Sequence, residues 1–130
     1  MNSYEEQVAE YLEEKGWRTI NLSPDLFLFN KFDKDEKGLA SALTEELGFA
    51  KVYCGVPDIL AFKYVQGEED WKYNILDYKF VEVKGRNDSL KLTQIKWMAR
   101  YNDFDFEIAI VDAEDGIHFF QTDISRGEIL

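Results

Sequence analysis

The sequence has very few of the residues that build disulfides and zinc sites. It contains one cysteine and one histidine in 130 residues. One chain can therefore form neither an internal disulfide nor a zinc or iron–sulfur site that needs several Cys or His ligands. Cys54 has no evident partner and is expected to be a buried thiol. A reducing, intracellular setting, either cytoplasmic or nucleoid-associated, is the default expectation.

Long apolar runs and a basic N-terminal segment are also missing. Residues 1 to 14 are acidic, and no stretch approaches about 18 consecutive apolar residues. The sequence therefore predicts no secretion signal and no membrane span.

Negative charge and aromatic residues are abundant instead. The formal net charge is −11, 45% of the residues are hydrophobic, and the chain has ten Phe, seven Tyr and three Trp. This composition is typical of a globular protein, and the length suits one domain with one core. The charge argues against binding nucleic acid through a generally basic surface, so such a function would depend on how the charges are distributed.

The hydrophobic periodicity predicts an α/β domain with a mixed β-sheet flanked by helices. Helices are expected at residues 3 to 15, at residues 39 to 47, and from a cap at Asp88 through Tyr101. Strands are expected at residues 17 to 22, 59 to 65, 73 to 84, 106 to 111 and 117 to 121. The second and third strands should pair antiparallel across a polar connection. Residues 1 to 130 would form a single domain, with a loop-plus-helix insertion at about residues 23 to 53.

Two strand segments carry residues suited to metal chemistry: G-V-P-D at residues 55 to 58 and F-V-E-V-K-G at residues 80 to 85. Side chains alternate along a strand, so Glu82 and Lys84 should share one face while the valines beside them face an apolar layer. Pro57 suits a strand start, and it leaves Asp58 where its carboxylate can converge with that of Glu82. Two carboxylates and a backbone carbonyl supply the oxygen ligands that Mg²⁺ prefers.

Each motif alone also has a plainer interpretation. An E-x-K pair on one strand face is usually a solvated ion pair, and P-D is an ordinary turn dipeptide. The joint spacing is more informative, because Asp58 and Glu82 stand 24 residues apart at the ends of a predicted hairpin and Gln94 follows ten residues after Lys84. This combination favours a metal-dependent nuclease.

With the helix pattern D-x-L-x-x-x-Q-x-x-W at residues 88 to 97, these motifs resemble the VRR-NUC (virus-type replication-repair nuclease) domains of the PD-(D/E)xK superfamily. The similarity is good over residues 55 to 101 and weaker over the first helix. It implies the restriction-endonuclease-like core and a Mg²⁺- or Mn²⁺-dependent phosphodiesterase that acts on structured DNA, such as branched junctions or flaps. A viral or microbial source fits it.

The resemblance also implies roles for individual residues. Asp58 and Glu82 would bind the metal together with the backbone carbonyl of Val83. Lys84 would orient the attacking water or offset charge developing on the phosphate oxygens. Gln94 fits either the active-site wall, which the resemblance favours, or a hydrogen-bonded position at the edge of the core.

These nucleases often add a carboxylate from the first helix to the metal site. Glu5 is the candidate here, because it borders the apolar stripe of that helix while Glu6 points away. The alternative is a plain glutamate at the helix border.

One segment of this acidic chain is basic: Lys84, Arg86, Lys91, Lys96 and Arg100 fall within seventeen residues whose only acid is Asp88. These cations fit either contacts to a DNA backbone or the solvated face of an amphipathic helix. His118, between apolar residues, is expected to be an ordinary strand residue.

Two other functions stay open at this point. The chain could be a Holliday junction resolvase or restriction-type endonuclease of the same superfamily. It could also be a non-catalytic interaction module on a nuclease fold, although such a module has no chemical need for Asp58, Glu82 and Lys84 together. Paired cuts in a four-way junction need two active sites, which favours a homodimer.

Overall fold

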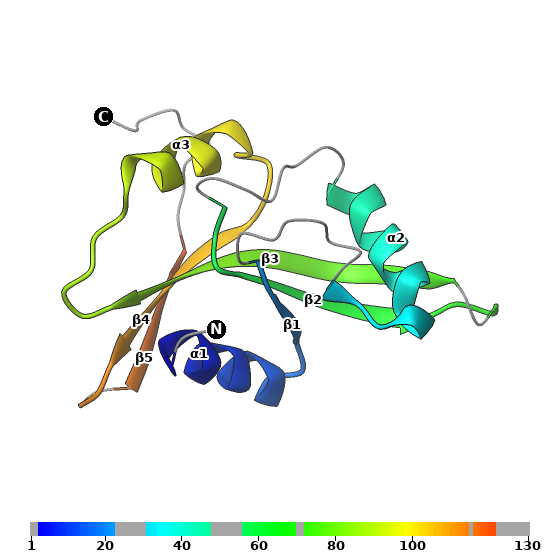
Figure 1. Cartoon of the computed structure of the whole chain (residues 1–130), viewed down its shortest axis with the longest axis horizontal. Coiled ribbons are helices and arrows are strands. Elements are labelled where there is room, and N and C mark those ends of the chain that lie inside the picture. The colour runs from blue at the N-terminus through cyan, green and yellow to red at the C-terminus, as the bar shows by residue number, and fades with distance from the viewer. Residues whose placement is uncertain (1–2, 23–30, 48–55, 70–71, 115, 122–130) are drawn as a thin grey trace.

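The computed structural model describes residues 3–22, 31–47, 56–69, 72–114 and 116–121. Its helices are α1 (Ser3–Glu14), the short 3-10 helix η2 (Lys34–Glu36), α2 (Lys37–Leu47) and α3 (Leu92–Arg100). Its strands are β1 (Arg18–Asn21), β2 (Ile59–Gln66), β3 (Tyr73–Gly85), β4 (Phe106–Asp112) and β5 (Gly116–Gln121). Figure 1 shows them in the order that the sequence predicts. Cys54 and much of the expected insertion at residues 23 to 53 lie outside the described residues.

The strands form one mixed sheet in the order β1-β2-β3-β4-β5. β3 pairs with β4 in parallel, and the other three neighbouring pairs are antiparallel. β3 is the central strand and has 13 residues. The mixed α/β sheet flanked by helices is confirmed.

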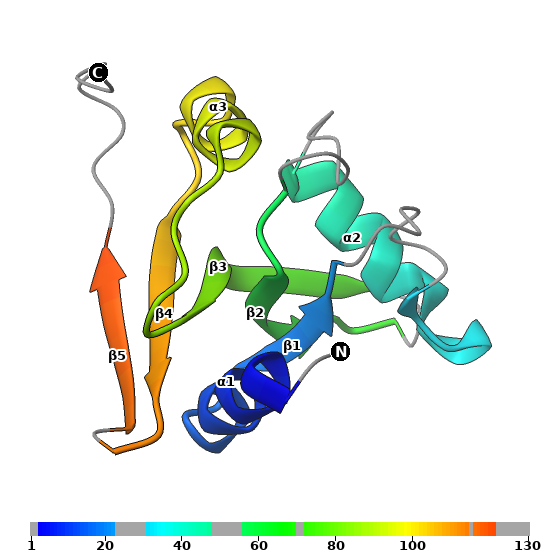
Figure 2. The same cartoon turned by 60° about the vertical axis from the view of Figure 1, so that its left-hand side comes forward.

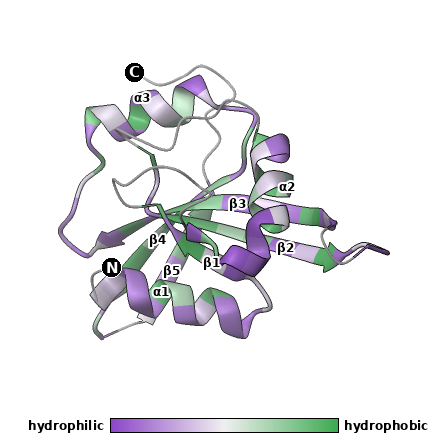
Figure 3. Ribbon diagram, turned by 45° about the vertical axis from the view of Figure 1, so that its right-hand side comes forward, coloured by the Kyte–Doolittle hydropathy of each residue, from purple (hydrophilic) through white to green (hydrophobic). Residues whose placement is uncertain are grey.

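Helices cover both faces of the sheet and create two apolar clusters (Figure 2). On one face, α2 and α3 bury a cluster that includes Leu39, Leu43, Phe62, Phe80 and Trp97. On the other face, α1 buries a cluster that includes Val8, Leu12, Ile59, Val81 and Ala109. The alternation along β3 explains the division, because Phe80 and Val81 are neighbours that point to opposite faces. Figure 3 shows the hydrophobic strands between more hydrophilic helices.

The helix α2 inside the expected insertion contributes to the main core. Its residues Leu39, Leu43 and Leu47 are buried. Just before it, the Glu36 carboxylate forms an ion pair and hydrogen bonds with the Arg18 guanidinium of β1. This segment is therefore tied to the sheet both by packing and by charge.

The start of α3 differs from the prediction. The helix begins at Leu92, and its N-cap is Lys91 rather than Asp88. The Asp88 carboxylate accepts a hydrogen bond from the Gly85 N–H at 2.7 Å, so it closes the turn after β3 instead of capping the helix. Asp and Asn side chains favour both uses, and spacing alone does not distinguish them. No helix in the described part of the chain is long and apolar enough to cross a membrane.

Candidate active site

Asp58 lies immediately before β2 and is held against the end of β3. Its carboxylate accepts a hydrogen bond from the Val83 N–H at 2.8 Å, and its backbone carbonyl accepts one from the Leu22 N–H at 2.8 Å. Two strands therefore fix this residue, one through its side chain and one through its backbone. The predicted convergence of Asp58 with β3 is present.

The buried Pro57 explains why the ladder between β2 and β3 ends at this point. Ile59 pairs with Val81, so continuation of the register would place Pro57 opposite Val83. A strand residue directs its N–H and C=O to the same side, and the Val83 N–H points toward Asp58. Because proline has no N–H, it cannot donate to the Val83 carbonyl. The Val83 carbonyl oxygen therefore points to the same side as the Asp58 carboxylate, and it accepts no strand-pairing hydrogen bond from Pro57.

Glu82 is the one buried charged side chain among the described residues, with 2% of its surface exposed. Its Oε1 accepts a hydrogen bond from the Gln94 Nε2 at 3.0 Å and lies 3.6 Å from the Lys84 Nζ. Its Oε2 is buried without a hydrogen-bond donor. A buried carboxylate oxygen without a partner is costly, so it points to a ligand that this oxygen is arranged to bind.

Gln94 connects the first turn of α3 to the E-x-K strand. Its Oε1 accepts hydrogen bonds from the Lys84 Nζ at 3.1 Å and from the Lys91 N–H at 2.8 Å, while its Nε2 donates to Glu82. The helix is held in place one turn later, where Trp97 packs on Phe80 with ring centroids 5.2 Å apart. One amide therefore fixes the positions of both Glu82 and Lys84.

Burial and the nearby Asp58 carboxyl raise the pKa of Glu82 to about 9. Burial is the larger cause, and the attraction of Lys84 lowers the pKa only in part. Glu82 and Asp58 are both acceptors when ionised, so they can share a hydrogen bond only while one of them keeps a proton. When no cation is bound, the raised pKa of Glu82 favours its protonated form.

This raised pKa predicts how the metal-free protein responds to pH. In the unfolded chain Glu82 releases its proton near the ordinary glutamate pKa of about 4.3, whereas in the folded chain it keeps the proton up to about pH 9. The folded state binds more protons across this window, so stability should fall as pH rises from about 5 to 9. Thermal melting in EDTA measures this, and Glu82→Gln should flatten the fall. An equal slope in Glu82→Gln and wild type would contradict the buried-carboxyl assignment.

The donor set fits a divalent metal that prefers oxygen ligands. The buried Oε2 of Glu82, the Asp58 carboxylate and the Val83 carbonyl are all oxygens, the ligand type that Mg²⁺ and Mn²⁺ favour. A cation at this point would replace the proton held between the two carboxyls, compensate the charge of both groups and give the Glu82 oxygen a partner. The predicted residue types thus meet at the end of β3.

A tight turn follows the site, and little space surrounds Gly85 at its start. A Cβ at Gly85 would lie 2.8 Å from Cε2 of Tyr4 and 3.1 Å from the Asp88 Oδ2. The Tyr4 ring from α1 and the Asp88 carboxylate therefore both occupy space that any other residue would fill. Sequence reasoning missed this use of Asp88, although the short G-R-N-D segment that contains it is a turn signal.

The structure does not bring Glu5 into a group with Asp58 and Glu82. In the described part of the chain no three His, Cys, Asp or Glu side chains are close enough to share a metal ion. Glu5 accepts a hydrogen bond from the Asn21 Nδ2 at 3.2 Å, and its helix α1 packs on the sheet face opposite to Glu82. The expected third carboxylate thus stands apart from the other two.

The basic residues expected to contact DNA are on the surface. Arg86, Lys91, Lys96 and Arg100 are exposed, in the turn after β3 and along α3. Lys91 is linked to the site directly, since its N–H binds the same Gln94 oxygen as Lys84. The basic segment therefore begins at the carboxylate pair and extends away from it.

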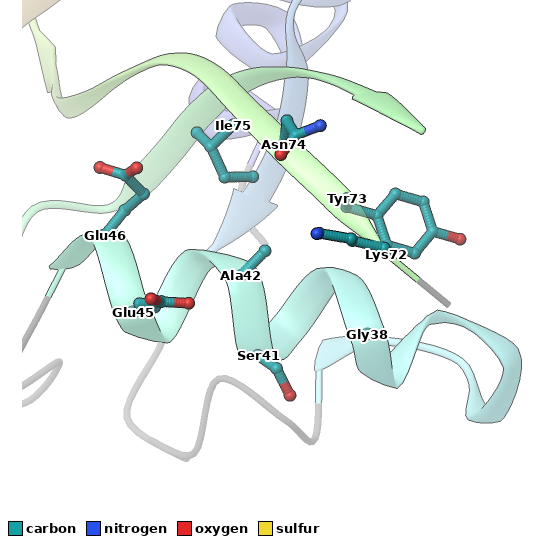
Figure 4. A pocket seen from close by; sticks show the side chains of 9 residues that line it. All are labelled: Gly38, Ser41, Ala42, Glu45, Glu46, Lys72, Tyr73, Asn74 and Ile75. Atoms are coloured by element: carbon teal, nitrogen blue, oxygen red, sulfur yellow. The ribbon is translucent and has the colours of Figure 1, made fainter. Parts of the chain in front are cut away.

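A separate hollow of about 600 Å³ lies between α2 and the first residues of β3, remote from Glu82. Figure 4 shows Ser41, Glu45 and Glu46 of α2 on one side and Tyr73, Asn74 and Ile75 on the other. Its carboxylates would repel the phosphates of a nucleic acid. The site at the end of β3 is the better candidate for phosphate chemistry.

Comparison with known families supports the assignment that the motifs indicated. The family described as VRR-NUC domain matches residues 31–115, which is more than half of the chain and includes α2, the carboxylate pair, Lys84 and α3. No curated protein and no solved structure gave a significant match. VRR-NUC domains are nucleases of the PD-(D/E)xK superfamily, and the chain belongs to the VRR-NUC domain family.

Proposed function

We propose that this protein is a Mg²⁺- or Mn²⁺-dependent deoxyribonuclease that hydrolyses phosphodiester bonds in structured DNA. The observation that supports this most strongly is the buried, unpartnered Oε2 of Glu82 beside the Asp58 carboxyl. The contacts of Glu82 with Lys84 and Gln94 use only Oε1, and a metal ion would give the buried Oε2 the partner that it lacks.

The proposed metal ligands are Asp58, Glu82 and the carbonyl of Val83. Glu5 is left outside this set because the structure does not group it with the two carboxylates. A bound Mg²⁺ or Mn²⁺ supplies Lewis acidity that polarises the phosphate and acidifies water. The protein holds both carboxylates ready on two strands, so little rearrangement is needed to form the site.

Lys84 is proposed to stabilise the charge that develops on the reacting phosphate. Its ammonium group lies 3.6 Å from the Glu82 Oε1 and donates to the Gln94 Oε1 at 3.1 Å. These two contacts aim the ammonium at the position of the carboxylate pair. Fixed donors of this kind are worth most where water is excluded, and Glu82 is buried.

DNA is proposed to approach along the exposed Arg86, Lys91, Lys96 and Arg100. These cations would contact phosphates and position the strand, while the acidic residues of α1 would face away and limit non-specific binding. A two-fold homodimer would supply the second active site needed for paired cuts in a branched substrate.

Cleavage of a defined DNA panel tests the proposal. Single-stranded, blunt duplex, flap and four-way substrates would be incubated with Mg²⁺, with Mn²⁺ and with EDTA, and light scattering would give the mass of the same preparation. We expect metal-dependent cuts that favour flap or four-way DNA, and a dimer. Equal cleavage of every substrate would refute the structural preference, and paired cuts by a monomer would refute the dimer.

A further inference from the structure

The sheet face that carries Glu82 and Lys84 continues onto β4 and β5. The register defines two rows across β3, β4 and β5, namely Glu82–Ile108–Phe120 and Lys84–Ile110–His118. Paired residues on neighbouring strands point to the same face. Phe120 and His118 therefore lie on the active-site face, in line with the two residues proposed to act on phosphate.

The neighbouring residues of β5 confirm this orientation. Phe119 lies between the two row residues, and its ring is 5.2 Å from the ring of Tyr11 in α1. Ile117 also packs on the cluster under α1. Ile117 and Phe119 of β5 thus face α1. The alternate residues of this strand, His118 and Phe120, therefore lie on the opposite face.

This part of the face is accessible. The aromatic ring of Trp97 in α3 covers the neighbouring pair, Phe80 of β3 and Phe106 of β4. Its centroid lies 5.2 Å from the Phe80 ring and 5.7 Å from the Phe106 ring. Beyond it, Phe120 is 52% exposed and His118 is also exposed. Figure 2 shows β5 at the outer edge of the sheet beyond β4. We define the β5 shelf as Ile108, Ile110, His118 and Phe120.

The β5 shelf carries no negative charge, although the chain has a net charge of −11. Both strands are fully described, and their only carboxylates are Glu107 and Asp112. Glu107 pairs with Lys79 at 3.0 Å on the α1 face. Asp112 ends β4 on the same face as the shelf, and its Oδ1 accepts the Glu114 N–H at 3.0 Å in the turn. The shelf therefore combines an exposed aromatic ring with an imidazole that can donate a hydrogen bond to phosphate.

We propose that the β5 shelf binds a nucleotide about three positions from the scissile phosphate, with an unpaired base stacked on Phe120 and its phosphate near His118. Two strand spacings separate β3 from β5 by roughly 10 Å, which is the span of about three stacked nucleotides at about 3.4 Å each. A base inside a duplex has both faces covered, so only an unpaired base can stack on a protein ring. The inference rests on the proposed nuclease function and specifies its substrate as nucleic acid with an unpaired nucleotide about three positions from the cut.

The test measures binding of a flap oligonucleotide that carries the fluorescent base 2-aminopurine about three nucleotides from the cut. Binding would be measured with Mn²⁺ in a Lys84→Ala background, so that the substrate stays intact. Phe120→Ala should weaken flap binding about fivefold to a hundredfold, the range for loss of one base–aromatic stack, and should abolish the quenching of the probe. Phe120→Trp should preserve both. Leu76→Ala is the matched control, since Leu76 is 63% exposed on β3 but lies outside the rows.

Three outcomes would overturn the proposal. The first is Phe120→Ala binding flap DNA as tightly as the parent protein. The second is an equal loss of flap and blunt-duplex affinity. The third is a Phe120→Ala protein whose molar mass by light scattering differs from that of the parent protein, because the shelf would then be a contact between two copies of the chain. Wild-type protein that binds and quenches the probe but never cleaves would contradict the nuclease proposal and leave the shelf supported.

Discussion

Replacing Lys84 by alanine is expected to reduce DNA cleavage by about 10²–10³-fold, the range for removal of one preorganised charge-stabilising donor. Metal binding should survive, because the proposed ligand oxygens belong to Asp58, Glu82 and Val83. Glu82→Ala should lose both metal binding and cleavage. Rates at saturating DNA and metal, together with calorimetric metal titrations, separate the two roles.

Lys79 offers a matched control for this experiment. It lies on the same strand and also pairs with a carboxylate, but its partner is Glu107 on the α1 face. Lys79→Ala should therefore keep cleavage within a few fold of wild type. Cleavage that survives in Lys84→Ala, or a metal affinity that collapses there, would contradict the role assigned to Lys84.

Divalent metal is expected to raise the melting temperature of the wild-type protein. A ligand that binds only the folded state at about a hundred times its Kd stabilises it by about 2.7 kcal/mol, which corresponds to about 10 °C for a domain of this size. The physical cause is that the cation replaces the proton that Glu82 holds beside Asp58, where burial and charge raise the pKa of Glu82 to about 9. Asp58→Asn should lose most of the shift.

Two controls separate specific binding from general screening of an acidic chain. Asp77 is an exposed aspartate on β3, so Asp77→Asn removes the same charge away from the site and should keep the full shift. NaCl at matched ionic strength should give only a small shift. An equal metal response in wild type and Asp58→Asn would mean that the metal acts elsewhere.

Local rules predicted the parts of the site that depend on one strand or one turn. Alternation placed Glu82 and Lys84 on one face, and proline chemistry placed Asp58 at the start of β2. These features can be predicted from the order of the helices and strands and from the residue periodicity within each of them. For Gln94 the sequence left two positions open, the active-site wall and the edge of the core, and its hydrogen bonds to Lys84 and Glu82 were not specified.

The parts that sequence reasoning missed depend on tertiary choices. Glu5 was expected at the metal because it borders the apolar stripe of α1, but the stripe does not say which sheet face the helix covers. Asp88 was expected to cap α3, but its carboxylate binds the Gly85 N–H instead. His118 was expected from its apolar neighbours to be a strand residue, and it lies in β5, but its alignment with Lys84 requires the register of three strands.

The most direct test of the account is incision of labelled flap DNA by wild type and Asp58→Asn across a titration of Mn²⁺. The two proteins differ by one group in the proposed site, and circular dichroism would establish that both are folded. Wild type should cut in proportion to metal occupancy and stop in EDTA, while Asp58→Asn should show little cleavage at any concentration. Cleavage by wild type in EDTA, or full cleavage by Asp58→Asn, would contradict the assignment of a metal-dependent active site to Asp58 and Glu82.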